Sequence, residues 1–108
     1  MGVDAVLYRV HQQGTSPRRR RFELLGMVVD TDGILARLPE THPGRFTSRI
    51  DPYGDAFVHG EEFADLVEDL TAIRDPSHAT TPTVLAKVVD LVRAHVGERG
   101  IELHLTGD

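Results

Sequence analysis

The sequence lacks several residue types that functional sites often need. Its 108 residues include no cysteine and no tryptophan. Without cysteine, the chain can form no disulfide, thiolate zinc site, iron–sulfur cluster or cysteine nucleophile. The longest apolar run covers only residues 24–29, whereas about 20 residues are needed to span a membrane. The sequence does not show basic residues followed by an apolar segment at its start, which is the pattern of a secretory signal peptide. We therefore expect a cytoplasmic protein, with no membrane segment and no cofactor.

The composition is typical of one folded domain covering residues 1–108. Hydrophobic residues make up 40% of the chain and charged residues 27%. The net charge of −5 is unevenly spread. Residues 1–54 carry eight basic and six acidic side chains, a net of +2, whereas residues 55–108 carry four and eleven, a net of −7. An acidic chain is not typical of nucleic-acid binders, so we expect a protein partner rather than a nucleic acid.

The apolar spacing predicts an α+β fold. Alternating apolar residues indicate strands over residues 3–10 and 101–105, an apolar run indicates one over 22–29, and two short strands are expected over 45–50 and 56–59. Helical spacing indicates helices over 60–74 and 82–98, and a short helix is expected over 33–38 before Pro39. Residues 3–10 are apolar on both faces, which predicts a central strand that is covered on both sides and paired with the last strand. We expect a single small domain with a mixed or antiparallel sheet of about four strands and two C-terminal helices packed on it.

The segment Asp51-Pro52-Tyr53-Gly54-Asp55 is the clearest turn signal. It predicts a hairpin between 45–50 and 56–59, with Gly54 at positive φ. Asp51, Tyr53 and Asp55 are candidate residues of a polar recognition site. The alternative is a purely structural turn, in which Asp51 accepts hydrogen bonds within its own turn.

Four adjacent arginines, Arg18, Arg19, Arg20 and Arg21, form the only concentrated positive charge. They are candidate binding residues for phosphates or for an acidic partner. No aromatic residue is interleaved with them, so a base-stacking platform is not indicated. The alternative is a solvated loop.

The segment 27–35, with Asp30 and Asp32 after an apolar strand, resembles the first motif of the haloacid dehalogenase superfamily. The resemblance implies that Asp30 is a nucleophile and Asp32 a general acid/base beside Mg²⁺. The residue after Gly33 is Ile34, where that superfamily usually has threonine. The alternative is a turn in which Asp32 caps the helix over 33–38. Because no two of the six histidines lie four residues apart on a helix, we assign no metal site, and we expect His104 on the polar face of the last strand.

The segment 49–57 and the ending 104–108 together carry a second resemblance. They are similar to a family of small, uncharacterised bacterial α+β proteins with an I-D-P-Y-G-D hairpin motif and a C-terminal strand that ends in Gly-Asp. Some small α+β proteins of this kind act as immunity or interaction modules. We therefore expect a non-enzymatic protein-interaction module, immunity-like in its mode of action. Two alternatives stay open, a small metal-dependent hydrolase or phosphatase using Asp30 and Asp32, and a binder of anionic ligands or nucleic acid through residues 18–21.

Overall fold

The computed structural model describes residues 2–12, 20–73 and 83–107. It shows one four-stranded antiparallel sheet with the strand order β2-β1-β4-β3. The strands are β1 (Asp4–Gln12), β2 (Arg20–Val28), β3 (Asp55–His59) and β4 (Ile101–Thr106). The predicted α+β class is confirmed, as is the central position of the first strand beside the last.

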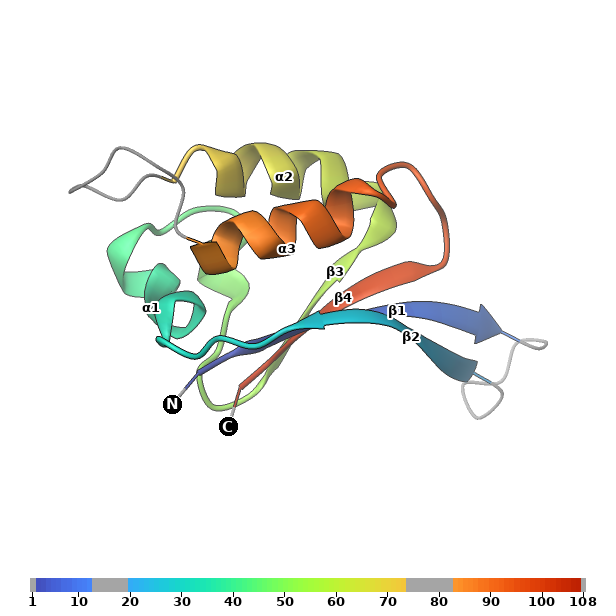
Figure 1. The fold of residues 1–108 in the computed structure, drawn as a ribbon, viewed down its shortest axis with the longest axis horizontal. Coiled ribbons are helices and arrows are strands. Elements are labelled where there is room, and N and C mark those ends of the chain that lie inside the picture. The colour runs from blue at the N-terminus through green and yellow to red at the C-terminus, as the bar shows by residue number, and fades with distance from the viewer. Residues whose placement is uncertain (1, 13–19, 74–82, 108) are drawn as a thin grey trace.

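All three α-helices lie on one face of this sheet (Figure 1). They are α1 (Ile34–Thr41), α2 (Phe63–Thr71) and α3 (Thr83–Arg93), and two short 3-10 helices, η2 (Thr47–Arg49) and η3 (Gly60–Glu62), join the elements around them. The expectation that β1 is covered on both sides is wrong, because the described elements cover only the face that bears Ala5 and Leu7. We call the other side the outer face.

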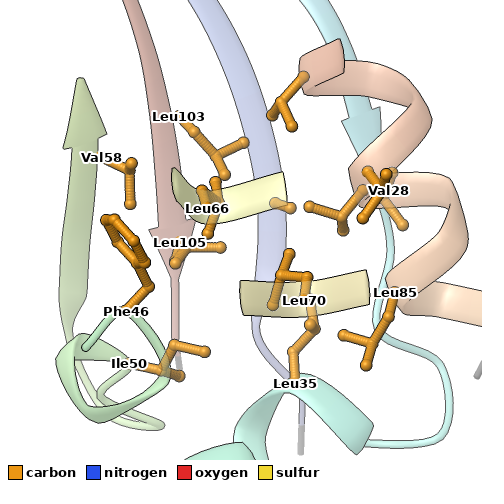
Figure 2. Packing of buried hydrophobic residues seen from close by; sticks show 14 of the residues in the cluster. Val28, Leu35, Phe46, Ile50, Val58, Leu66, Leu70, Leu85, Leu103 and Leu105 are labelled. Atoms are coloured by element: carbon orange, nitrogen blue, oxygen red, sulfur yellow. The ribbon is translucent and has the colours of Figure 1, made fainter. Parts of the chain in front are cut away.

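The core fills the layer between the sheet and the helices. Leucines of α1, α2 and α3 converge there on apolar side chains of the strands and on Phe46 and Ile50 from the segment before β3 (Figure 2). In β4 the burial alternates as the sequence predicts, with Ile101, Leu103 and Leu105 all buried. Helical spacing in α2 and α3 likewise directs one apolar stripe toward the sheet.

The second long helix is shorter than its sequence pattern predicts. The described part of α3 ends at Arg93, and Val96 is 43% exposed instead of extending the buried stripe. Gly97 and Gly100 have φ values of 85° and 76°, a backbone conformation that residues with a Cβ rarely adopt. These two glycines turn the chain back into β4. The predicted helix start at residue 82 lies outside the described residues.

Two predictions about the middle of the chain are wrong. Residues 45–50 form no strand, because the segment contains η2 instead, and β3 pairs with β4, so the predicted hairpin does not exist. The spacing of Phe46 and Ile50, four residues apart, buries both side chains from a helical turn. The first helix also continues past its predicted end, with Pro39 inside it.

Candidate functional site on the outer face of the sheet

The outer face carries apolar and aromatic side chains from all four strands. Strand register puts opposite residues on the same face, and the pairs on this side include Val6 with Met27, Tyr8 with Leu24, Val10 with Phe22, and Phe57 with His104. Several of these side chains are far from buried: Phe22 is 48% exposed, Leu24 61%, Met27 56% and Phe57 47%. Contiguous exposed apolar surface of this kind typically marks an interaction site.

Four rings form an aromatic cluster at the centre of this face: Tyr8, Phe22, Phe57 and His104. The centroid of the His104 ring lies 4.8 Å from that of Tyr8, 5.7 Å from that of Phe22 and 4.7 Å from that of Phe57. The Phe22 and Phe57 rings stand at 72° and 81° to the His104 ring. These edge-to-face arrangements are the favoured ones for ring pairs, so the cluster is a preformed platform.

Glu102 holds the ring of His104 in place from the same strand. His104 Nε2 lies 3.1 Å from Glu102 Oε1, and the two side chains are only 16% and 15% exposed. The sequence predicts the face of this histidine correctly. It does not predict that the ring is packed, because three of its four neighbours come from other strands.

A hollow of about 320 Å³ opens beside the aromatic cluster. It is lined by Phe22, Phe57, His59, Glu102 and His104. Two apolar rings and a carboxylate thus share one concave site, a combination that suits a group with both positive charge and apolar surface.

Charged residues of both signs occupy outer-face positions. Asp4, Asp55 and Glu102 lie at such positions on β1, β3 and β4, and the strand register also puts Arg20, opposite Gln12, at a position of this face. The carboxylates on β3 and β4 favour positive charge in the part of a partner that lies over these two strands.

A second polar cluster lies between η2, β3 and the start of α2, and it stabilises the fold. Arg49 donates two hydrogen bonds to Glu62, at 3.2 and 2.7 Å, and a third to the carbonyl of Phe57. The guanidinium groups of Arg45 and Arg49 lie 4.9 and 5.0 Å from the ring centroid of the buried Phe46. These contacts fasten η2 to the start of α2.

The pKa of Glu62 gives a test of this cluster. Its hydrogen bonds from Arg49 and from the amide of His59 lower the pKa from 4.5 to about 2. A carboxyl whose pKa is lower in the folded state stabilises the protein above pH 4.5, and that contribution is lost as the pH falls toward 2. Because Glu62 is 20% exposed, we expect Glu62→Gln to lower the free energy of unfolding by about 1–2 kcal/mol at neutral pH.

Denaturant melts of wild type and Glu62→Gln across this pH range are the measurement. The two stabilities should converge as the pH approaches 2. A difference that stays constant over the whole range would contradict the role assigned to Glu62.

The predicted recognition residues of the Asp51–Asp55 turn lie at the N-terminal end of β3. Asp51 Oδ1 accepts a hydrogen bond of 2.9 Å from the amide of Tyr53, as the structural alternative requires. Tyr53 is 73% exposed, and Asp55 is exposed as well. The prediction of positive φ at Gly54 is wrong, since only Gly33, Gly97 and Gly100 have it among the described glycines.

The turn is joined to the C-terminal end of β4. The amide of Gly107 donates a 2.7 Å hydrogen bond to the carbonyl of Gly54. A Cβ on Gly107 would lie 2.4 Å from the carbonyl oxygen of Asp51 and 2.5 Å from that of Pro52. The two segments behind the second resemblance therefore pack against each other, which gives both of them a structural role.

The predicted arginine site is only partly described. Arg18 and Arg19 lie outside the described residues, whereas Arg20 and Arg21 belong to β2 and not to a loop. Arg21 is exposed opposite His11, and the strand register puts both residues at positions of the helix-bearing face.

Asp30 is buried, with 4% of its surface exposed. Its Oδ2 accepts hydrogen bonds of 3.1 Å from the amides of Val3 and Ala36, so it joins the start of β1 to the first turn of α1. The N-cap residue of α1 is Gly33, so the predicted capping by Asp32 is wrong, and Asp30 instead accepts the hydrogen bond from the amide of the third helical residue, Ala36. This geometry favours the structural alternative over a nucleophile.

Comparisons with protein-family models, with curated proteins and with solved structures find no match for this chain. No group of three or more histidine, aspartate or glutamate side chains in residues 2–12, 20–73 and 83–107 is arranged to hold a metal ion. The helices of the same ranges include none that is long and apolar enough to cross a membrane.

Sequence patterns alone do not predict the aromatic cluster. The alternation in residues 3–10 places Tyr8 on the face opposite to the core, and that in 56–59 does the same for Phe57. What the sequence does not contain is the strand order, which brings Phe57 and Tyr8 to either side of His104.

Proposed function

We propose that this protein is a non-enzymatic interaction module that binds a segment of a partner protein on its outer face. The observation that carries the proposal is the aromatic cluster, to which each described strand contributes one ring and in which Phe22 and Phe57 are about half exposed. Leaving such rings in water forgoes about 25 cal/mol for each Å² that a partner could cover. An immunity-like role, in which the chain would neutralise a partner by binding it, is an analogy with other small α+β proteins.

The size of the outer face supports a short segment as the occupant. The strands have 9, 9, 6 and 5 residues. At about 3.3 Å per residue and 4.8 Å between strands, the face covers roughly 450 Å² in projection. A stable interface between globular domains buries about 800 Å² on each partner. A peptide-like segment therefore fits this face better than a second folded domain.

Charge supports a partner other than a second copy of the chain. Each copy carries a net charge of −5. Two such copies repel each other, whereas a basic segment is attracted and associates faster at low salt. The occupant we propose combines apolar side chains with arginine or lysine.

The same charges count against nucleic acid as the occupant. Single-stranded nucleic acids stack on exposed rings but also need a positive groove along the phosphates. The net charge of the chain and the carboxylates on β3 and β4 are unfavourable for phosphates. The register puts Arg20 at an outer-face position at the start of β2, and binding of phosphates through this end of the strand stays a separate hypothesis.

A selection from a displayed library of random dodecapeptides tests the proposal with a defined probe. We expect enriched peptides that combine apolar and basic residues, and whose affinity falls at least about tenfold for Phe57→Ser, the size typical of a lost hot spot. Val96→Ser is the matched control, because Val96 is similarly exposed at 43% but follows α3. Its affinity should stay within about twofold.

Three outcomes would overturn the proposal. One is a set of peptides whose affinity does not respond to Phe57→Ser. Another is a stable dimer in sedimentation experiments that Phe57→Ser dissociates, which would assign the outer face to a second copy. The third is binding of single-stranded DNA that Phe57→Ser abolishes.

A further inference from the structure

We infer that the bound segment lies across the strands in one direction, with its apolar residues over β2 and its basic residue beside Asp55 at the start of β3. The inference rests on the proposed function and adds the orientation of the segment and the carboxylate that recognises its charge. It is carried by one juxtaposition: the outer face has exposed apolar side chains on the edge strand β2 and an exposed carboxylate on the opposite edge strand β3.

The edge strand β2 supplies the apolar end. Leu24 and Met27 are 61% and 56% exposed, and the register puts both on the outer face. The only acidic residue of β2 is Glu23. It lies opposite Arg9 at a position of the helix-bearing face, and Arg9 Nη1 is 3.7 Å from Glu23 Oε2. The outer-face positions of β2 therefore favour apolar side chains of a partner and offer no carboxylate to a basic one.

The edge strand β3 supplies the charged end. Asp55 is its first residue and lies on the same face as Phe57, two residues further on. The Asp55 side chain is exposed, and its carboxylate forms no hydrogen bond or ion pair within residues 2–12, 20–73 and 83–107. Asp55 and Asp4 both pair with Thr106 of β4, one from each side. A basic side chain at this end of the face is thus attracted by two carboxylates, of which Asp55 is the more exposed.

The reverse orientation is unfavourable at both ends. The register puts Arg20 at an outer-face position at the start of β2, so a basic residue over β2 would meet a cation instead of a carboxylate. Apolar residues over the start of β3 would cover the Asp55 carboxylate without a hydrogen-bonding partner, and burial of an unpaired charge is costly.

The width of the sheet sets the spacing within the segment. The edge strands β2 and β3 are three strand spacings apart, which is roughly 14 Å at 4.8 Å per spacing. An extended chain covers about 3.3 Å per residue, so at least about five residues separate the apolar residues of the segment from its basic residue. A dodecapeptide is long enough to reach from one edge to the other.

A double-mutant cycle between a selected peptide and the protein tests the charged contact. The basic residue of the peptide is replaced by glutamine. We expect this change to weaken binding to the wild type about two- to fivefold, the size typical of an exposed ion pair, and binding to Asp55→Asn less than about 1.5-fold. Asp90→Asn is the matched control, because Asp90 is an equally acidic, exposed residue of α3. With this variant the glutamine penalty should equal that of the wild type.

Paramagnetic labels on the peptide test the orientation in the wild-type protein, without any protein variant. A nitroxide next to the basic residue should broaden the amide signals of Asp55 and Thr106 most strongly. A nitroxide at the apolar end should instead broaden the signals of Leu24 and Met27 most strongly.

The inference is overturned if the glutamine penalty persists in Asp55→Asn, if Asp90→Asn removes it as well, or if the two labels give the reverse pattern or the same pattern. Enriched peptides without a basic residue would overturn it too. In each of these cases the proposed function stands as long as binding responds to Phe57→Ser. Binding that does not respond to Phe57→Ser would overturn both.

Discussion

Replacing Gly107 by alanine is expected to lower the free energy of unfolding by about 2–3 kcal/mol. The added Cβ would lie 2.4–2.5 Å from backbone atoms of Asp51 and Pro52, closer than real Cβ contacts. Backbone atoms cannot swing away as the end of a flexible side chain can. The turn and the end of β4 must therefore separate, which also strains the hydrogen bond from Gly107 to Gly54.

Denaturant melts of Gly107→Ala and of Thr106→Ala are the measurement. Thr106 is the exposed neighbour on β4, so its substitution should change stability by about 0.5 kcal/mol or less. Equal stabilities of the two variants would show that the turn and the C-terminal end of β4 are not in close contact.

Replacing Asp30 by alanine is expected to cost about 2–4 kcal/mol. The amides of Val3 and Ala36 both donate to the same oxygen, Oδ2, and would lose their acceptor together. Asp30→Asn can keep a carbonyl oxygen at that position, so its cost should be about 1 kcal/mol. Asp32→Ala, at an exposed position, should be nearly neutral.

The asparagine variant also separates a structural role from catalysis. Because it should stay folded, any activity that it lost would be chemical in origin. We expect no Mg²⁺-dependent hydrolysis of an aryl phosphate by the wild type. Such an activity, present in the wild type and absent in Asp30→Asn, would establish the enzyme hypothesis and contradict ours. Equal stability of Asp30→Ala and Asp32→Ala would contradict the structural role of Asp30.

The sequence predicts those parts of the fold in which local periodicity and burial agree. The alternation in residues 101–105 gives β4, and helical spacing around Leu66 and Leu70 gives α2. Prediction fails where local signals compete. Pro39 marks a helix end in most contexts, but here the burial of Leu35 and Leu38 holds α1 together around it.

The outer face shows why the proposed binding surface is harder to predict than the core. Apolar residues on both faces of β1 indicate that both faces can be buried, either by other parts of the chain or by a partner. The sequence of one strand does not distinguish between these two cases. The register between strands decides this, because it places Tyr8, His104 and Phe57 in contact. Tyr53, by contrast, could be picked out from the turn sequence as a candidate recognition residue. Among the described residues, no second ring packs against it.

Mapping a selected peptide onto the protein by NMR is the most direct test of the central claim, that the outer face is the binding surface. Addition of the peptide should shift the signals of Tyr8, Phe22, Phe57 and His104, one residue from each strand. The signals of α2, which lies on the other face of the sheet, and of Val96, which follows α3, should stay unchanged. Shifts confined to the helices, with the four rings unaffected, would contradict the account.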